Sequence, residues 1–270
     1  YLLLGYVTYE EGLHLPHVAA GINLNLPLVG GILRRGGAFF LRRSFKGNRL
    51  YAAVFYAYIN QILVKGYSME YFVEGGRSRT GRLLAPKAGM LVMTVNSYVK
   101  SPQRPIVFVP IYFGYEKLIE GDSFINELGG AKKKKESISG LFSSIKSLRD
   151  QFGKVYVNIA EPIELEPILE RLYPEWREYE SENGERPPWL AGIVDKLGGQ
   201  IMQGINSAAA VTPISLLAYV LLATPRQAIG LDELRRQLEV SLRLLQRFKY
   251  SDSVTLPDWS ADQIILHGEK

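Results

Sequence analysis

The sequence predicts an α/β fold in which a mainly parallel sheet is flanked by helices and followed by a C-terminal helical region. Two observations predict the sheet: short apolar runs alternate with segments of helical periodicity, and this alternation continues to about residue 165. The third observation is a change of character after Pro162, where helical patterns follow one another without strands. We therefore expect an α/β core in residues 1–165 and a linker with a C-terminal helical region in residues 166–270.

The predicted elements begin with a glycine-rich apolar segment at residues 15–33, where two prolines prevent a single long helix. Residues 38–41 are expected to form a short strand. Residues 50–65 form a helix because apolar side chains recur at three- and four-residue spacing. Gly66 then supplies a C-terminal stop.

Strands and helices continue to alternate along the core. The apolar run at residues 69–73 is typical of a buried strand, and a helix over residues 89–98 follows. Further strands are expected at residues 106–113 and 155–160, with an amphipathic helix at residues 139–151 between them.

The C-terminal part carries helical patterns. Residues 172–189 are polar and contain three prolines, so we expect a linker or a docking arm. Helices are expected at residues 190–206, 213–222 and 232–248, and Asp232 is a suitable N-cap for the last of them.

Composition narrows the classes of function. The chain has no cysteine, which excludes disulfides, thiolate metal sites and cysteine nucleophiles. Its net charge of +5 suits anionic partners such as phosphate metabolites, anionic lipid heads or acidic carrier proteins, although an ordinary basic surface explains it equally well. The charge is too diffuse to indicate nucleic acid. No run reaches the roughly 18–20 apolar residues of a spanning helix.

The most informative segment is residues 72–82, Phe-Val-Glu-Gly-Gly-Arg-Ser-Arg-Thr-Gly-Arg, which follows the expected strand. Gly75 and Gly76 allow a sharp turn and a close approach of the backbone to a ligand. Fork-shaped donors suited to phosphate follow at Arg77, Arg79 and Arg82. A loop after a strand of an α/β sheet is a common ligand site. The segment therefore indicates a phosphate site, with a solvated loop as the alternative.

Glu74 has three possible roles at this strand end: orienting an arginine, acid–base chemistry, or capping the glycine turn. The segment is not a P-loop, because Arg82 and Leu83 stand where lysine and a hydroxyl residue are required.

Two further motifs end or interrupt strands. Arg42 and Arg43 are neighbours on an extended chain, so at most one should face a site, and a solvated strand end is the alternative. Pro110 cannot donate to a sheet ladder and marks an edge, a bulge or a strand end. Its apolar neighbours line an acyl-chain channel or form a plain core strand.

Two weaker signals have a structural interpretation. His14 and His17 lack partners at metal-ligand spacing, so we regard them as structural or surface residues. The basic run at residues 132–135 is more typical of a solvated loop than of a docking patch for an acidic carrier protein or anionic lipid.

Taken together, these segments resemble the acyltransferase family that esterifies glycerol 3-phosphate, and most closely its membrane-bound bacterial members. Residues 37–43, 72–79 and 109–112 are similar to the family's second, third and fourth motif blocks, and residues 19–25 extend the likeness. The first block, His-x4-Asp, is expected to end immediately before Tyr1 and is not in the sequence. We expect that the sequence is trimmed there.

The resemblance implies acyl transfer from acyl-CoA or acyl carrier protein to the 1-hydroxyl of glycerol 3-phosphate, giving lysophosphatidic acid for phospholipid synthesis. The missing histidine would be the general base and the missing aspartate would orient it. The phosphate or glycerol would be held by Arg43, Arg77 and Ser78, with Arg42 or Arg79 assisting.

Glu74 and Gly75 would shape the catalytic centre, and Pro110 would help to position the acyl donor. The resemblance implies no metal, no other cofactor and no nucleic-acid partner, and it places the protein at the cytoplasmic face of the bacterial inner membrane as a peripheral or monotopic protein. The alternatives are an acyltransferase acting on dihydroxyacetone phosphate or lysophosphatidic acid, and a non-catalytic module that binds lipid or phosphate.

Overall fold

The computed structural model describes residues 2–27, 29–42, 44–45, 47–76, 78, 80–117, 125, 129, 153–179 and 185–269. The chain divides into two compact units. The first comprises residues 1–108, 125–146 and 162–202, and the second comprises residues 109–124, 147–161 and 203–270. The expected division at residue 165 stays a prediction.

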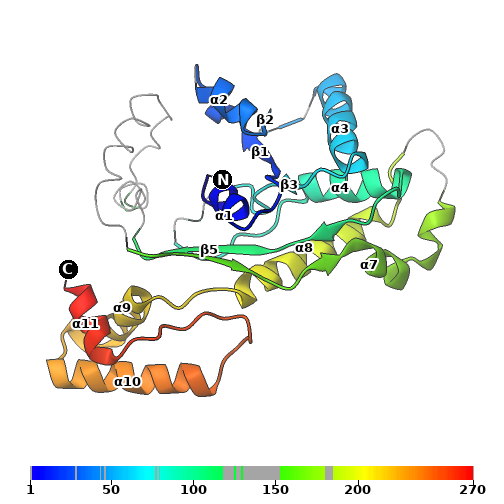
Figure 1. Ribbon diagram of the computed structural model, residues 1–270. Coiled ribbons are helices and arrows are strands. Elements are labelled where there is room, and N and C mark those ends of the chain that lie inside the picture. The colour runs from blue at the N-terminus through cyan, green and yellow to red at the C-terminus, as the bar shows by residue number, and fades with distance from the viewer. Residues whose placement is uncertain are drawn as a thin grey trace. The chain divides into compact units, whose positions relative to one another are not determined.

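The first unit combines helices with short strands (Figure 1). In chain order its elements are α1 (Leu2–Glu10), β1 (His17–Gly21), η1 (Ile22–Leu24), α2 (Val29–Arg35), β2 (Ala38–Leu41), α3 (Arg49–Val64), β3 (Met69–Glu70), α4 (Ala88–Lys100), β4 (Val107–Phe108), β7 (Ile163–Glu164), α7 (Leu165–Leu172), η2 (Pro174–Glu178) and the first part of α8 (Leu190–Ser207).

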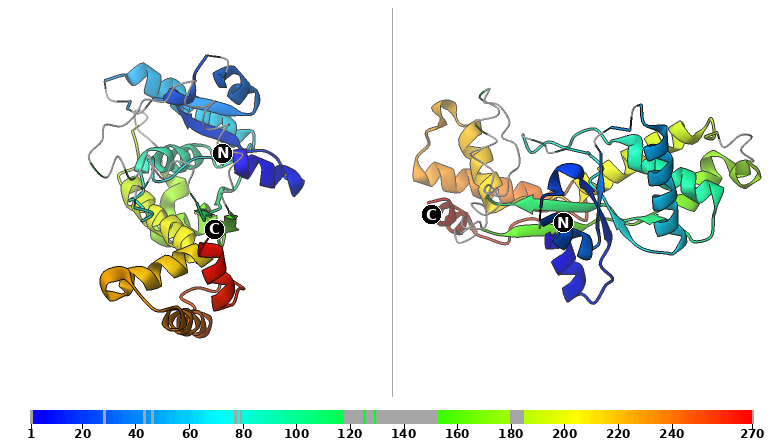
Figure 2. Two further views of the ribbon diagram at one scale, coloured as in Figure 1. Left: turned by 90° about the vertical axis from the view of Figure 1, so that its left-hand side faces the viewer. Right: turned by 90° about the horizontal axis from the view of Figure 1, so that it is seen from above.

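A parallel sheet in the order β2-β1-β3 organises this unit. The helices α3 and α4 contact each other, as two further views show (Figure 2), and they pack on one face of the sheet. That face buries Ala19 and Phe39, which are paired across β1 and β2, against Phe55 and Ile59 of α3 and Met93 of α4. Side chains alternate between the faces of a strand, so this packing fixes the register of the sheet.

Helix α3 begins and ends with sequence-encoded caps. The Asn48 side chain accepts a hydrogen bond from the backbone N–H of Tyr51 at 2.9 Å, which satisfies a free donor of the first turn. Gly66 adopts a φ of +76° after the last turn, and the Tyr67 N–H reaches back to the Ile62 carbonyl at 3.0 Å. The predicted glycine stop is confirmed.

The segment expected to be a linker is packed where the structure describes it. Trp176 of η2 is only 1% exposed, and its ring stacks on that of Tyr98 from α4. Tyr173 likewise stacks on Trp189 with ring centroids 4.9 Å apart. The burial of these aromatic rings therefore packs the proline-rich segment against the first unit. Its polar composition did not indicate this packing.

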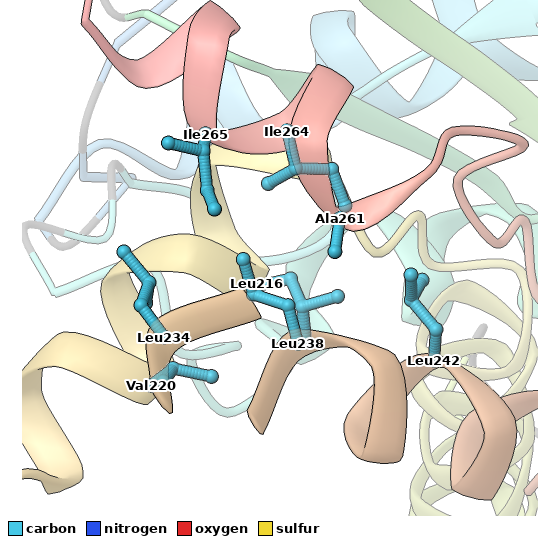
Figure 3. Close-up of a cluster of buried hydrophobic side chains, with 8 residues drawn as sticks. All are labelled: Leu216, Val220, Leu234, Leu238, Leu242, Ala261, Ile264 and Ile265. Carbon is cyan, nitrogen blue, oxygen red and sulfur yellow. The ribbon is translucent and has the colours of Figure 1, made fainter. Parts of the chain in front are cut away.

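The second unit consists of a β-hairpin-like pair and a helical cluster. Its elements are β5 (Ile111–Tyr115), β6 (Val155–Ile159), the end of α8, α9 (Pro213–Ala223), η4 (Pro225–Gln227), α10 (Leu231–Arg247) and α11 (Ala261–Gly268). The core of the cluster is aliphatic: Leu216, Val220, Leu234, Leu238, Leu242, Ala261, Ile264 and Ile265 point toward one another (Figure 3).

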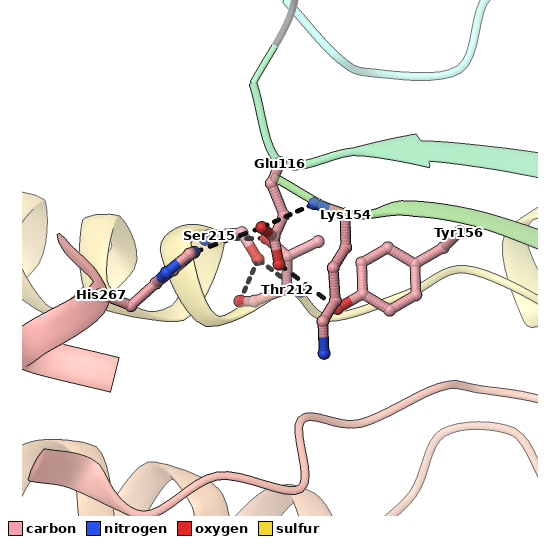
Figure 4. A network of polar contacts seen from close by, with 6 residues as sticks. All are labelled: Glu116, Lys154, Tyr156, Thr212, Ser215 and His267. Atoms are coloured by element: carbon pink, nitrogen blue, oxygen red, sulfur yellow. Dashed lines mark hydrogen bonds and ion pairs between the residues drawn. The ribbon is translucent and has the colours of Figure 1, made fainter. Parts of the chain in front are cut away.

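Polar contacts of Glu116 connect the end of β5, the start of β6 and helix α11. Glu116, whose side chain is 3% exposed, accepts hydrogen bonds from the Lys154 backbone N–H at 3.0 Å and from the Tyr156 hydroxyl at 3.4 Å (Figure 4). The His267 Nε2 of α11 lies 3.2 Å from the same carboxylate. Burial raises the pKa of Tyr156, and the nearby negative charge of Glu116 raises it further.

The expected α/β class is confirmed, with one parallel sheet and many helices. Two strand pairs that the sequence did not reveal, β4–β7 and β5–β6, are antiparallel. The strand expected at residues 106–113 is interrupted at Pro110, and β4 and β5 join different partners on its two sides. Proline has no backbone N–H to donate to a neighbouring strand, which explains the interruption.

Other boundaries also differ from expectation. The strand expected at residues 69–73 is only Met69–Glu70, because the chain turns before the glycines. Asp232 is not the N-cap of α10: Gly230 holds that position, and Asp232 pairs with Arg235 in the first turn. The helix expected at residues 139–151 and the basic run at 132–135 lie outside the described residues. Within the described ranges, no helix has the length and apolar character needed to cross a bilayer.

Candidate functional site

The segment after β3 forms a tight turn at the edge of the parallel sheet. The Gly75 N–H donates to the Phe72 carbonyl at 3.0 Å, which closes a four-residue turn with Glu74 inside it. Gly75 has a φ of +60°, in the left-handed region that glycine adopts without strain. A Cβ at this position would lie 2.8 Å from the Cγ of Lys87, so space as well as conformation favours glycine.

Glu74 closes the loop that follows. One of its carboxylate oxygens accepts a hydrogen bond from the Leu84 backbone N–H at 2.6 Å. The bond joins the two ends of an arginine-rich loop, residues 74–84, and a charged acceptor makes such a bond stronger than a neutral one. Of the three roles expected for Glu74, the geometry supports the structural one, in which the carboxylate holds the turn.

Lys87 is a residue that the sequence argument missed. Its backbone N–H donates to the Val73 carbonyl at 2.7 Å, and its side chain lies across Gly75. It occupies the N-cap position of α4, whose first turn contains no acidic residue. A cation at the positive end of a helix dipole favours an anion nearby. A lysine two residues before the predicted helix at 89–98 was the signal available in the sequence.

Of the predicted substrate-binding residues in this loop, the structure describes Ser78. The Ser78 hydroxyl oxygen is shielded from solvent and has no hydrogen-bond partner in the described part of the chain. A buried hydroxyl of this kind gains from a ligand that accepts or donates a hydrogen bond. Arg77 and Arg79, like Arg43 after β2, lie outside the described residues, so their roles stay predictions.

Arg42 lies at the end of β2, at the same edge of the sheet. Its backbone N–H donates to the Tyr51 hydroxyl at 3.2 Å, and its guanidinium lies 4.8 Å from the centroid of that ring. Stacking of this kind leaves the in-plane N–H groups free for an anion. Because β1, β2 and β3 are parallel, their carboxyl ends carry Arg42 and the loop at 74–84 to one edge.

Glu70, the last residue of β3, is a second residue that the sequence argument missed. Both carboxylate oxygens are buried without a hydrogen-bond partner among the described residues, and burial raises its pKa. Its neighbours Met69 and Tyr71 pack toward α3 and α4, so Glu70 points to the opposite face of the sheet. A carboxylate in the apolar run at 69–73 was its sequence signal.

Pro110 lies in the second unit and is among the residues that the structure describes. It is buried, its carbonyl accepts a hydrogen bond from the Ala160 N–H at 2.9 Å, and its ring touches Gly204 of α8. A Cβ at Gly204 would lie 2.9 Å from the proline Cγ, so the two residues pack tightly. These contacts give Pro110 a structural role, and its contact with an acyl donor stays a prediction.

A groove of the first unit beside β4, β7 and α7 does not suit phosphate. Its volume is about 350 Å³, and its lining includes three carboxylates, which would repel an anion: Glu164, Glu166 and Glu170. Among the histidines, His17 contacts the ring of Tyr67 edge-on. The described residues contain no cluster of ligands that could hold a metal ion.

Comparison with known families gives two matches along the chain. A family described as "Glycerol-3-phosphate acyltransferase C-terminal region" matches residues 124–270. A second family, described as "Acyltransferase", matches residues 1–114 and therefore includes the turn after β3 and the end of β2.

Curated relatives agree with these matches. A protein named glycerol-3-phosphate acyltransferase from Xanthomonas campestris pv. campestris is 52% identical over 271 residues, which cover 100% of this chain and 31% of the relative. Proteins of the same name are 50% identical in Pseudomonas aeruginosa PAO1 and 51% identical in Xylella fastidiosa, covering 98% and 100% of this chain and 32% and 31% of those relatives. The chain thus spans about a third of the length of its relatives.

Proposed function

Because this chain belongs to the family of glycerol-3-phosphate acyltransferase C-terminal regions, we propose that the full-length protein acylates glycerol 3-phosphate at its 1-hydroxyl. The acyl donor is a thioester of coenzyme A or of acyl carrier protein, and the product is lysophosphatidic acid. Relatives that are 50–52% identical and are named glycerol-3-phosphate acyltransferase support this proposal.

One structural observation carries the proposal: a cationic turn closes the carboxyl edge of the parallel sheet. Gly75 makes the turn possible, Glu74 holds its loop, and Lys87 adds a positive charge beside it. An anionic substrate is the ligand that this charge favours. The expected phosphate contacts of Arg43, Arg77 and Arg79 would add bidentate hydrogen bonds, with Arg42 and Ser78 nearby.

The chemistry follows ordinary acyl transfer. The 1-hydroxyl oxygen attacks the thioester carbonyl, a C–O bond forms, and the C–S bond breaks. The hydroxyl proton passes to a general base and then to the leaving thiolate. The proposed base is the histidine of a His-x4-Asp motif upstream of Tyr1. Within this chain, Glu74 and Gly75 shape the centre, and Pro110 helps to place the donor.

The proposed site of action is the cytoplasmic face of the bacterial inner membrane, with peripheral or monotopic attachment. The relatives are bacterial proteins, and the lipid product supports a location at a membrane surface.

The test is acyl transfer to labelled glycerol 3-phosphate by membranes that contain the full-length protein. Palmitoyl-CoA and palmitoyl carrier protein are offered in separate arms. Arg77→Ala should raise the KM for glycerol 3-phosphate roughly tenfold or more, because a charge-assisted contact to phosphate is lost. Arg171→Ala, which changes an exposed arginine of α7, serves as the matched control and should leave the KM unchanged.

Parallel assays with dihydroxyacetone phosphate and lysophosphatidic acid as acceptors decide between related acyltransferases. A preference for either of them over glycerol 3-phosphate would replace the proposed acceptor. Absence of transfer to all three acceptors, with labelled glycerol 3-phosphate still bound, would leave a non-catalytic phosphate-binding module.

A further inference from the structure

Helix α10 of the second unit carries an exposed apolar line opposite its buried face. Leu238 and its neighbours one turn away face the core of the unit (Figure 3). On the other side Val240, Leu244 and Phe248 are 41%, 53% and 67% exposed. Their four-residue spacing places them in one line along the helix and just past its end. Three large apolar side chains in a solvent-facing line are unusual for a helix that only covers a core.

Cations without acidic partners run beside this line. In the first half of α10 the arginines form ion pairs with carboxylates of the same unit. Arg235 pairs with Asp232 of α10 and Asp262 of α11, and Arg236 pairs with Glu233. In the second half no acidic residue stands between Glu239 and Asp252. Within the described residues, no ion pair involves Arg243 and Arg247 of this half, or Lys249, which lies two residues past the end of the helix. We call these cations and the apolar line together the α10 docking face.

The order of the two lines around the helix indicates the kind of partner. With about 100° between residues, Arg247 projects almost directly away from the buried Leu238, and Val240 and Leu244 lie to one side of it. A helix that lies in a lipid surface places its apolar residues deepest and its cations on the flanks. Here the cations stand on only one side of the apolar line: with the same spacing, Arg243 and Arg247 lie at about 140° and 180° from Leu238, and Val240 and Leu244 lie at about 200° and 240°. This arrangement complements a protein helix that has an acidic line beside an apolar one.

We propose that the α10 docking face binds an acidic amphipathic helix of a partner protein, and that this partner is the carrier-protein form of the acyl donor. The inference rests on the proposed function and assigns part of donor recognition to the second unit. The unpaired cations attract the acidic helix over a distance of about a Debye length, and the apolar line fixes its register.

The test compares two donors of the same acyl chain in the full-length protein. In the double variant Arg243→Glu with Arg247→Glu, kcat/KM for palmitoyl carrier protein should fall roughly tenfold or more at low ionic strength. The value for palmitoyl-CoA should stay within about twofold, as for most surface changes. The parent's rate with the carrier protein should fall as salt rises, and the variant should lose most of that dependence.

Two further variants isolate the cause. Leu244→Ser keeps every charge and should raise the KM for the carrier protein alone. Lys196→Glu with Arg171→Glu makes the same change of net charge on exposed positions of α8 and α7 and should affect neither donor. Circular dichroism and thermal unfolding confirm that each variant is folded.

The outcomes separate this inference from the proposed function. Equal loss with both donors, or no loss with either, would overturn the docking face. Loss of binding to anionic phospholipid vesicles in the double variant, with both donors unaffected, would assign the face to lipid and also overturn it. An inactive parent would refute the proposed function alone, and the Kd of the carrier protein for parent and double variant would then decide the docking face.

Discussion

The turn after β3 and the cluster of α9, α10 and α11 differ in whether their polar groups have hydrogen-bond partners. The cluster satisfies them locally: Thr212 with Ser215, and Ser260 with Gln263, form reciprocal capping boxes at the starts of α9 and α11. Around β3, Glu70 and the Ser78 hydroxyl are buried without partners among the described residues. Satisfied groups stabilise a scaffold, whereas buried unsatisfied ones beside a glycine turn are typical of a ligand site.

The difference extends to packing. The cluster is held by branched aliphatic side chains that lose water on folding, and its helices begin with hydroxyl caps. The turn depends on a few backbone hydrogen bonds and one carboxylate. Substitutions in the cluster should therefore alter stability, and substitutions in the turn should alter substrate affinity.

The largest effect is expected for Leu238→Ala in the cluster. Leu238 is fully buried at its centre, and removal of its side chain leaves a cavity that the neighbours fill only in part. The free energy of unfolding of the second unit should fall by about 2–5 kcal/mol, measured by urea denaturation of the full-length protein. Leu244→Ala on the exposed side should change it by less than about 0.5 kcal/mol. Equal effects of the two would show that the cluster is not the core.

The next effect is expected for Gly75→Ala in the turn. The left-handed backbone costs a residue with a Cβ about 1–2 kcal/mol, and the Lys87 side chain must also move. The kcat/KM for glycerol 3-phosphate should fall roughly tenfold, with little change in the unfolding of the second unit. Gly89→Ala in α4, where a Cβ meets open space, is the matched control and should keep full activity. An active Gly75→Ala protein would contradict the requirement for this turn.

A smaller effect is expected for Glu74→Gln. The amide still accepts a hydrogen bond from the Leu84 N–H but lacks the charge, which weakens the contact by roughly 1 kcal/mol. The KM for glycerol 3-phosphate should rise about fivefold while kcat changes little. If kcat falls by orders of magnitude at unchanged KM, Glu74 is an acid–base group and the structural role is wrong. Glu175→Gln in η2 is the control for loss of one exposed carboxylate.

The smallest effect concerns the pH dependence of stability. Burial raises the pKa of Glu70 above its ordinary value of 4.5, so the folded protein holds this proton more tightly than the unfolded chain does. The contribution of Glu70 to stability is therefore complete at pH values below 4.5 and is lost as pH rises through the higher folded pKa. Glu70→Gln should remove this loss, so its melting temperature relative to the parent should increase from pH 4 to pH 8. A constant difference across this range would refute the assignment.

The helices of the scaffold were the most predictable part of the molecule. Helices α3, α8, α9 and α10 follow from their apolar spacing within a residue or two, because each buries one face. Helix α2, with adjacent glycines at its start, and the eight-residue α11 were not predicted. The glycines of α2 lower its local helix preference, whereas α11 begins with the Ser260–Gln263 capping box, a local signal that the sequence argument did not use.

The candidate site was predictable in composition and not in geometry. The glycines and arginines of residues 72–82 indicated a turn and an anion. The partners of that turn, Lys87 and Leu84, follow it by about ten residues and contact it only because the chain folds back. Pairings of strands far apart in sequence, such as β5 with β6, were equally invisible to local patterns.

The most direct test of the contrast between turn and cluster is amide hydrogen exchange with and without glycerol 3-phosphate. We predict slower exchange across residues 72–87 when glycerol 3-phosphate is present, a smaller change with inorganic phosphate, and none with glycerol. Exchange in α9, α10 and α11 should stay the same in all four conditions. Unchanged exchange in the turn, or equal protection of the turn and the helical cluster, would contradict the claim that the turn after β3 binds the substrate.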